Sequence, residues 1–498
     1  MGSTRRIMMK LDLSFANIYN QYKACRKNKR NTVNALKFEE NQEAELLKLQ
    51  HELITRTYRP GRSVCFYTTK PKLREIFAAD FKDRIVHHIL VDYLENIFEP
   101  KFIFDSYACR KEKGVHAGVK RLQRFSQKVT KNGRQKAYFL QLDIHNFFMN
   151  INKKVLYQQL SNSVRDETAQ WLCHLLVHHD CRDNYQLKGN KKLQQAVPPH
   201  KTLFNCNAGV GLPIGNLNSQ FFANVYLDVL DQFVKHQLKC RYYVRYCDDF
   251  VLLADSIEQL MDWRNQIEAL LVIQLKLTLN TKEQLLPINN GINFLGYIVR
   301  PDYLLVRRRV VNQLKEKLTK YRLLLIEKLE SQVVYHFDYN LLHQLHATLA
   351  SYLGHLKMAN SHRLEQSLLR KHDWLNAYFI FTESGVERKY KVPKQFDNVK
   401  QQYLFFRWRF APLVVLFQVG KYIEFFHQED RKLARVLKLK PLKKNKRKAR
   451  FGFPISQLTT KVNRLISMDI ACCIVKQGDG VYTRVMPRTV EHIIDLLR

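Results

Sequence analysis

Residues 242–254 read YYVRYCDDFVLLA, two apolar runs on either side of an adjacent pair of acids, Asp248 and Asp249. Runs rich in β-branched and aromatic residues predict two strands joined at the acid pair. Adjacent carboxylates repel each other and no Gly is present to favour a tight turn, so a purely structural role explains the pair poorly. Carboxylate oxygens are ligands for hard cations. We therefore expect this hairpin to bind a metal ion.

A third acid follows another strand-like segment. Residues 137–142 read AYFLQL, which predicts a buried strand, and Asp143 comes directly after it. Three carboxylates match the needs of nucleotidyl transfer, in which two Mg²⁺ ions about 3.5–4 Å apart clamp the entering and leaving oxygens. Because Mg²⁺ keeps few protein ligands, the three acids and one backbone carbonyl, that of Ile144, would suffice. Two Mg²⁺ ions are therefore the expected cofactor, with Mn²⁺ as a substitute.

The rest of the chain divides into blocks of different pattern. Residues 33–54 have a helical period, and residues 135–300 alternate strand-like and helical segments, which indicates an α+β arrangement around an antiparallel sheet. Helical patterns return in residues 310–329 and 341–369. A polar segment with Gly and Pro follows, and the last hundred residues or so alternate strand and helix patterns. The expected domains are 1–135, 136–300, 301–380 and 395–498.

The chain is strongly basic. Its 82 Lys and Arg residues outnumber 45 Asp and Glu residues, a formal net charge of +37. Aromatic residues are interleaved with the basic ones, so nucleic acid fits better than a membrane or an acidic protein, and a solvated basic surface is the alternative. No apolar run reaches the ~18 residues of a membrane span, and the ten cysteines do not form a disulfide pattern. A cytoplasmic protein is expected.

Six segments form one pattern along the chain. They are YCDD at 246–249, DIHNFF at 143–148, GLPIGNLNSQ at 211–220, LTLNTKE at 277–283, NFLGY at 293–297 and KPKLREIFAADFKDRIVH at 70–87. Together they resemble the reverse transcriptases of bacterial retroelements. The resemblance covers roughly residues 20–370 and implies a right-hand polymerase with palm, fingers and a helical thumb.

The resemblance implies roles for individual side chains. Asp143, Asp248 and Asp249 are the expected catalytic metal ligands. Lys282 matches a lysine that protonates the pyrophosphate leaving group, a general-acid role. Lys72 and Arg74 match positions in the fingers that contact the triphosphate of the incoming nucleotide, where a point charge and a forked guanidinium suit phosphate oxygens.

Further positions bear on nucleotide selection. Phe148 matches a bulky ring under the sugar that excludes a 2′-hydroxyl, which implies deoxynucleotide substrates. The resemblance also implies that Ile214, Gly215 and Gln220 contact the nucleotide. Ile214 stands where group II intron enzymes and retrons commonly have Gln. This pattern is similar to reverse transcriptases of diversity-generating retroelements and of related lineages, some of them antiphage defence systems. Loss of the amide predicts reduced template fidelity.

Residues 420–424 of the carboxy-terminal block read GKYIE, a Gly-x-aromatic-x-Glu element that contains Tyr422 and Glu424. The block resembles the amino-terminal, mismatch-recognition domain of the MutS family, in which such an element places a ring against a base. Ordinary strand residues in a scaffold or oligomer contact are the alternative. Residues 431–450 contain eleven basic residues and no acid, which predicts a phosphate-binding track, with a flexible solvated loop as the alternative. The expected contacts are Lys443, Lys444, Lys446, Arg447 and Lys448.

The combined prediction is a Mg²⁺-dependent, RNA-directed DNA polymerase in bacterial antiphage defence. Its expected partners are an RNA template, such as a dedicated noncoding RNA, the DNA product, deoxynucleoside triphosphates, and an accessory protein or a second copy of the chain. Alternatives are a diversity-generating reverse transcriptase of low fidelity, a template-independent or noncoding-RNA-dedicated DNA synthase, and a nucleic-acid-binding scaffold with an inert palm.

Overall fold

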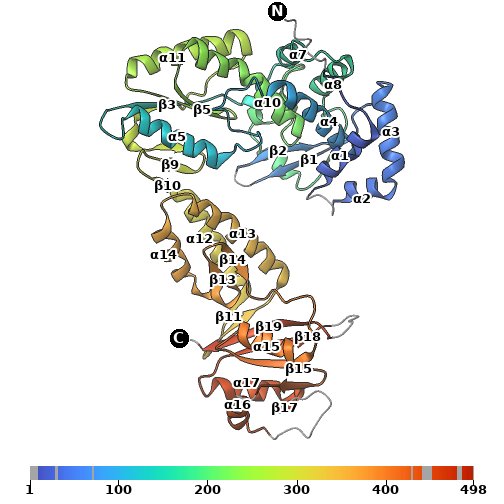
Figure 1. The fold of residues 1–498 in the computed structure, drawn as a ribbon, viewed down its shortest axis with the longest axis vertical. Helices are drawn as coiled ribbons and strands as arrows, with labels where there is room; N and C mark the ends of the chain where they lie inside the picture. The colour runs from blue at the N-terminus through green and yellow to red at the C-terminus, as the bar shows by residue number, and fades with distance from the viewer. Residues whose placement is uncertain are drawn as a thin grey trace, which may run out of the picture. The chain divides into compact units, whose positions relative to one another are not determined.

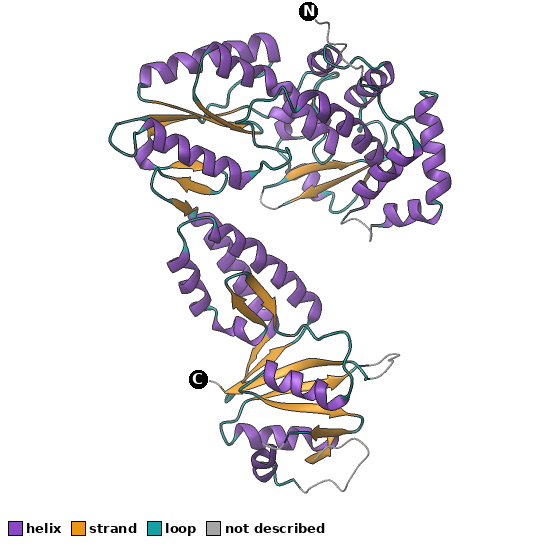
Figure 2. Ribbon diagram, viewed as in Figure 1, coloured by secondary structure: helices purple, strands orange, loops and turns teal. Residues whose placement is uncertain are grey.

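The computed structural model describes residues 9–27, 32–69, 72–427, 430–439, 451–478 and 485–496. The chain forms two compact units (Figure 1, Figure 2). The first comprises residues 1–295 and 299–303, and the second comprises residues 296–298 and 304–498. The chain passes from one to the other near strands β8 (Ile292–Phe294), β9 (Tyr297–Val299) and β10 (Leu304–Val306).

The first unit mixes helices and short strands. Its helices are α1 (Phe15–Arg26), α2 (Val33–Glu40), α3 (Gln42–Ile54), α4 (Phe81–Phe98), α5 (Val115–Val129), α6 (Phe147–Asn150), α7 (Lys153–Ser161), α8 (Glu167–His178), α9 (Lys192–Ala196), α10 (Leu217–Gln232) and α11 (Ile257–Leu270). Its strands before β8 are β1 (Ser63–Thr68), β2 (Arg74–Ala78), β3 (Tyr138–Asp143), β4 (Tyr185–Leu187), β5 (Tyr242–Tyr246), β6 (Asp249–Ala254) and β7 (Gln284–Pro287).

A four-stranded antiparallel sheet of order β5-β6-β3-β7 carries the expected metal-binding acids. Residues 250–254 of β6 are all buried. Such continuous apolar runs are typical of strands covered on both faces. Helices α5 and α11 both pack against these strands, and Figure 1 shows them on opposite sides of the sheet. The predicted strands at 137–142 and 242–254 and the antiparallel sheet are confirmed.

A second sheet of the first unit, of order β2-β1-β4, contains the expected fingers segment. Strand β1 pairs antiparallel with β2 and parallel with β4. Helix α4 follows β2 directly and packs against α10 and α1. Asp80 is the N-cap residue directly before α4, and its side chain accepts a hydrogen bond from the backbone N–H of Lys82, which satisfies one free donor of the first turn.

The second unit continues with helices and a larger sheet. Its helices are α12 (Arg308–Leu325), α13 (Tyr339–Lys357), α14 (His362–Lys371), α15 (Val399–Arg409), α16 (Asp430–Val436) and α17 (Leu458–Ile466). Its strands after β10 are β11 (Ile326–Lys328), β12 (Gln332–His336), β13 (Phe379–Thr382), β14 (Gly385–Arg388), β15 (Val414–Val419), β16 (Tyr422–Phe425), β17 (Phe451–Pro454), β18 (Cys472–Gln477) and β19 (Arg488–Leu496).

Seven strands of this unit form one sheet of order β11-β12-β19-β18-β15-β16-β17. Strand β12 pairs antiparallel with β19, so a hairpin from the expected thumb extends the sheet of the carboxy-terminal segment. A single apolar core, which contains Leu318, Leu349, Phe417 and Ile493, continues through both parts. The predicted four-domain division stays a prediction.

The helical patterns of the expected thumb correspond to shorter helices than predicted. The helix expected over 310–329 ends at Leu325, because the chain turns into β11. The pattern over 341–369 contains two helices, α13 and α14. Between them, the side chain of Asn360 accepts a hydrogen bond from the backbone N–H of Leu304, and its own N–H donates to the Leu304 carbonyl. Within the described part of the chain, no helix is long and apolar enough to cross a membrane.

Candidate polymerase active site

The three acids lie at one edge of the four-stranded sheet. Asp143 is the last residue of β3 and Asp249 the first of β6, and the strand register places them opposite each other. Asp248 lies in the turn between β5 and β6, and its carbonyl accepts a hydrogen bond of 3.2 Å from the N–H of Ile144. Cys247, beside it, has a φ of 58°, so this two-residue turn uses left-handed backbone without Gly.

Two amide side chains hold the acids. Nδ2 of Asn280 donates to Oδ2 of Asp143 at 3.1 Å, and the N–H of Asn280 donates to the Asp143 carbonyl at 2.8 Å. Nε2 of Gln141 donates to Oδ1 of Asp249 at 2.9 Å. Sequence reasoning missed both residues. Because strand side chains alternate, the spacing of Gln141 and Asp143 already placed both on one face of the strand.

Burial and mutual repulsion raise the pKa values of the aspartates. Burial and the nearby charges of Asp143 and Asp248 raise the pKa of Asp249 to about 7. The pKa of Asp248 is raised by burial and by Asp143, and that of Asp143 by burial. A site of this kind is stabilised when a cation neutralises it.

The donor set fits hard divalent cations, because it consists of carboxylate oxygens facing one cavity of about 790 Å³. Ile144, the expected carbonyl ligand, also lines that cavity. Among the residues that the structure describes, no three Asp, Glu, His or Cys side chains already stand at the spacing of a formed metal centre. The three carboxylates therefore line one cavity, but their oxygens do not converge at the spacing of a metal centre.

Basic residues of the fingers line the same cavity. Lys72 and Arg74 are exposed and lie at or just before the start of β2. The charge of Lys72 lowers the pKa of Asp143, and that of Arg74 lowers the pKa of Asp248, each as a minor contribution beside burial. The next residue, Glu75, is buried and accepts hydrogen bonds from Oγ1 of Thr202 and the N–H of Leu203. This contact fixes the strand that presents Arg74.

The segment of Ile214 and Gly215 packs against the same strand. The Ile214 carbonyl accepts a hydrogen bond of 2.9 Å from the N–H of Phe77, and Ile214 lines the cavity. Gly215 has a φ of +123°, and a Cβ there would lie 2.7 Å from Cγ2 of Ile76. This close approach explains why the position has Gly. Gly215 and Gln220 are exposed and are not among the described residues that line the cavity.

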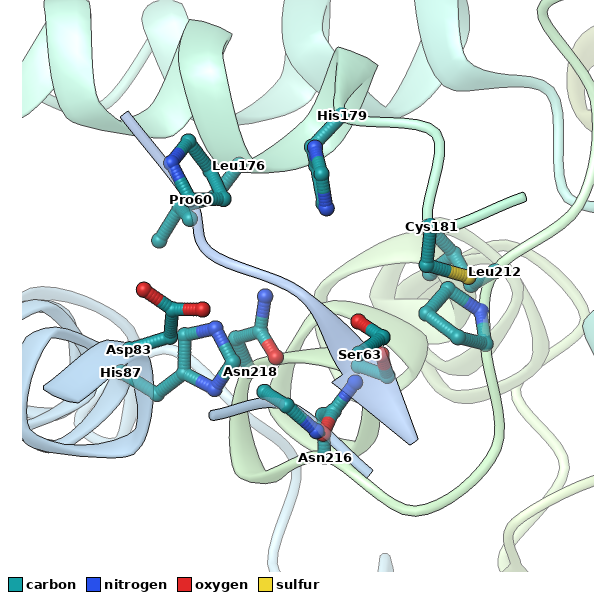
Figure 3. A pocket seen from close by; sticks show the side chains of 13 residues that line it. Pro60, Ser63, Asp83, His87, Leu176, His179, Cys181, Leu212, Asn216 and Asn218 are labelled. Atoms are coloured by element: carbon teal, nitrogen blue, oxygen red, sulfur yellow. The ribbon is translucent and has the colours of Figure 1, made fainter. Parts of the chain in front are cut away.

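A small cavity of about 20 Å³ is lined by Ala79, which follows β2, and by Asn216, which follows Gly215. Figure 3 shows the side chains around it. Among them, Oδ1 of Asn216 accepts a hydrogen bond of 3.0 Å from the N–H of Ala79, which ties the start of α10 to the end of β2. His87 is also there, and burial lowers its pKa to about 3, so the ring is neutral at physiological pH. This polar cluster joins the fingers segment to the segment around Gly215.

Two more expected residues line the main cavity. Phe148 is half-buried, and its ring packs edge-on against that of Phe147 with centroids 5.4 Å apart. Lys282 is exposed. The structure therefore brings Lys72, Arg74, Phe148, Ile214 and Lys282 around one cavity with the three aspartates.

The carboxy-terminal candidates lie in β16. Tyr422 is 45% exposed, whereas Glu424, two residues further along the strand, is buried. Lys443, Lys444, Lys446, Arg447 and Lys448 lie outside the described residues, so the predicted phosphate track stays a prediction.

Comparisons with known proteins agree with this geometry. Residues 68–299 match the family described as reverse transcriptase (RNA-dependent DNA polymerase), and residues 397–494 match MutS domain I. Residues 68–299 are thus a segment similar to a reverse transcriptase domain. This confirms the predicted enzyme class, an RNA-directed DNA polymerase, and the α+β right-hand fold. The matched family works with divalent metal ions.

Individual relatives are distant. Protein YkfC of Escherichia coli K12 is 24% identical over 313 residues, which is 55% of this chain and 76% of the relative. The group II intron-encoded protein LtrA of Lactococcus lactis is 26% identical over 203 residues, 40% of this chain and 30% of LtrA.

Among solved structures, the telomerase from Candida albicans with a fragment of telomeric RNA is 12% identical, with a TM-score of 0.34. The match covers 65% of this chain and 58% of that one. The apo telomerase of Candida tropicalis is 10% identical with a TM-score of 0.37, over 52% of this chain and 59% of that one.

Proposed function

We propose that the first unit copies RNA into DNA with two Mg²⁺ ions held by Asp143, Asp248 and Asp249. The observation that carries this proposal is the shared cavity, in which the three acids face the basic pair Lys72 and Arg74. Anionic ligands for metal ions on one wall and cations on the other suit a nucleoside triphosphate that arrives with bound Mg²⁺.

Each side chain has a separate task in this proposal. The three carboxylates and the Ile144 carbonyl would hold the ions, which when bound lower the pKa of the primer 3′-hydroxyl and neutralise the triphosphate. Asn280 and Gln141 orient the carboxylates through their hydrogen bonds. Lys72 and Arg74 bind the phosphates, and Lys282 donates a proton to the departing pyrophosphate.

Substrate choice would depend on Phe148 and Ile214. The Phe148 ring is held by Phe147 and borders the cavity, so it excludes a sugar that has a 2′-hydroxyl. Ile214 is fixed by its hydrogen bond to β2 and presents an aliphatic side chain where an amide would donate and accept hydrogen bonds. Loss of these bonds would relax the check on the templating pair, which supports the low-fidelity alternative.

The second unit would bind nucleic acid through Tyr422 and the basic segment 443–448, whereas Glu424, the other expected contact, is buried in β16. The match to MutS domain I and the exposure of Tyr422 support this proposal. The biological setting that we propose is antiphage defence in bacteria, with diversity-generating retroelements as the second candidate. The template and partners would be an RNA, a DNA product and an accessory protein or a second copy of the chain.

Primer extension on an RNA template tests the activity. Wild-type protein should extend a DNA primer with deoxynucleotides in the presence of Mg²⁺, and Asp248→Asn should lower the rate by about 10³-fold or more, because a lost metal ligand removes several kcal/mol of transition-state stabilisation. Asp262→Asn is the matched control, since Asp262 is an exposed acid on α11. Equal rates for wild type and Asp248→Asn would favour the scaffold with an inert palm.

A test of the setting uses cells. Sequencing of the nucleic acid that co-purifies with the wild-type chain and with Asp248→Asn identifies template and product. A defence role predicts that Asp248→Asn also abolishes protection in phage plating assays. Sequence diversification of a target gene without protection would favour the second candidate.

A further inference from the structure

A second cavity lies entirely within the second unit, between the end of α15 and the start of α16. It has a volume of about 300 Å³. The connection between α15 and β15 forms one side, and residues of α16 form another. The residues that line it include Tyr403, Arg407, Trp408, Pro412, Asp430 and Lys432.

Trp408 gives this cavity an exposed aromatic wall. Helix α15 buries Gln402, Tyr403 and Phe406 and packs against β15. Because successive helical residues are about 100° apart, Trp408 lies on a different face from Phe406. Its side chain is 67% exposed, a large apolar area for a residue of this type. Exposed aromatic groups beside a cavity are typical of binding sites.

Two cations border the same cavity. Nε of Arg407 lies 3.5 Å from Oδ1 of the buried Asp430. The other oxygen of this carboxylate, Oδ2, accepts hydrogen bonds of 2.8 Å from the Tyr403 hydroxyl and the N–H of His427. The guanidinium is therefore held in place at the cavity wall. Lys432 is exposed at the start of α16.

The surface next to the cavity is basic. The exposed side chains of α16 are those of Arg431, Lys432 and Arg435, and Lys438 is exposed just after the helix. The one acid of α16, Asp430, is buried beneath them. Lys461 and Arg464 of α17 donate to the carbonyls of Leu437 and Val436 at the end of α16. Helix α16 is thus fixed at both ends and presents several positive charges to solvent.

We propose that this cavity binds a single-stranded segment of nucleic acid, with an unstacked base against the Trp408 ring and phosphates on Arg407 and Lys432. A flat aromatic face beside closely spaced cations is the arrangement that single strands require, because the ring stacks on the base and the cations replace counterions at the phosphates. The site differs from Tyr422 and Glu424, which do not line it, and from the polymerase cavity in the first unit.

Tryptophan fluorescence of the full chain tests the proposal. The chain has four tryptophans. Besides the exposed Trp408 these are Trp263 and Trp374, which are buried, and Trp171, which is half-buried. Oligothymidylate and oligouridylate should quench the wild-type protein, since a stacked base quenches indole. The difference between wild type and Trp408→Phe isolates the signal of Trp408, and we expect that difference to saturate.

Affinity measurements provide the second readout. Trp408→Ala should weaken binding of the oligonucleotides about tenfold, because stacking on an aromatic ring contributes ~1–3 kcal/mol per base. Lys432→Glu should weaken it and lower the slope of log affinity against log salt by about one or more. Met468→Ala is the matched control, since Met468 is an exposed apolar residue of the same unit that does not line the cavity. Thermal unfolding of each variant verifies folding.

Two results would overturn the proposal. One is a fluorescence change equal in wild type and Trp408→Phe at saturating oligonucleotide. The other is that both Trp408→Ala and Lys432→Glu bind the oligonucleotides with wild-type affinity. This includes the case in which the two substitutions weaken only the binding of an acidic peptide. Primer extension on a short duplex should be unchanged in Trp408→Ala, so a failure here is distinct from a failure of the proposed polymerase.

Discussion

Asp143 and Asp249 lie directly opposite each other at the matching ends of two neighbouring antiparallel strands, β3 and β6. Each carboxylate accepts a hydrogen bond from an amide side chain, Asn280 for Asp143 and Gln141 for Asp249. The relationship follows from strand register, so two acids more than a hundred residues apart in sequence are held by backbone pairing. The amides then fix the directions of the carboxylates.

Asn280→Ala should raise the Mg²⁺ concentration needed for half-maximal primer extension by roughly tenfold to hundredfold, the usual effect of removing a group that orients a metal ligand. The physical reason is that the hydrogen bond from Asn280 lowers the pKa of Asp143 against the effect of burial. A Mg²⁺ titration of extension rate measures the change. Asn265→Ala, at an exposed position of α11, should titrate like wild type, and an identical curve for Asn280→Ala would contradict the assigned role.

Gly215→Ala should destabilise the chain by about 2–4 kcal/mol, from the strained backbone and from the contact with Ile76. Gly133→Ala separates the two causes, because Gly133 also has a positive φ, +83°, but a Cβ there meets nothing within 4 Å. Thermal unfolding should show a larger loss for Gly215→Ala. Equal losses would mean that close packing against β2 does not matter.

Phe148→Ala should admit ribonucleotides. Removing the ring takes away the steric contact with a 2′-hydroxyl, and the ratio of kcat/KM for deoxynucleotides to that for ribonucleotides should fall about tenfold or more. Single-nucleotide incorporation with each substrate measures this ratio. Phe148→Tyr keeps the ring and should keep the selectivity, and a ratio unchanged in Phe148→Ala would remove Phe148 as the gate.

Asp231→Asn should destabilise the first unit by roughly 3–5 kcal/mol, because it leaves the Arg245 guanidinium buried without its counter-charge. Nη2 of Arg245 lies 2.6 Å from Oδ2 of Asp231, and both side chains are almost completely buried. Arg245 also donates to the Ser106 hydroxyl and the Cys247 carbonyl, next to the turn of Asp248.

Chemical denaturation followed by circular dichroism measures this loss. Glu95→Gln is the control, because the side chain of its partner, Lys111, is largely exposed and such surface pairs contribute at most about 1 kcal/mol. A similar small loss in Asp231→Asn would show that the buried pair does not hold this part of the fold.

The palm could be predicted from sequence because its strands are continuous apolar runs that end in acids. The turn at Asp248 and the antiparallel pairing both follow from local signals. By contrast, β11 and β12 could not be predicted, because β11 pairs with β12, and β12 pairs with β19, more than 150 residues later in the chain. Residues 326–328 belong to the predicted helical pattern, and pairing with β12 overrides that pattern. The β-branched residues Val333 and Val334, which lie outside the predicted helices, join the sheet of β19.

The candidate site could be predicted in its charged residues but not in its neutral ones. Asp143 and Asp248 could be identified from sequence because each lies next to a strand-like segment. Asn280 could not, because its role depends on a hydrogen bond to Asp143, 137 residues away in sequence. Trp408 was missed because a lone aromatic residue in a helix usually packs in the core, and only the structure shows that it does not.

Anomalous diffraction from crystals of the chain with primer, RNA template, a non-hydrolysable deoxynucleotide and Mn²⁺ tests the central claim most directly. We predict two metal peaks in the cavity, coordinated by Asp143, Asp248 and Asp249, with the triphosphate toward Lys72 and Arg74. Peaks elsewhere, or none in this cavity with the nucleotide bound, would contradict the account.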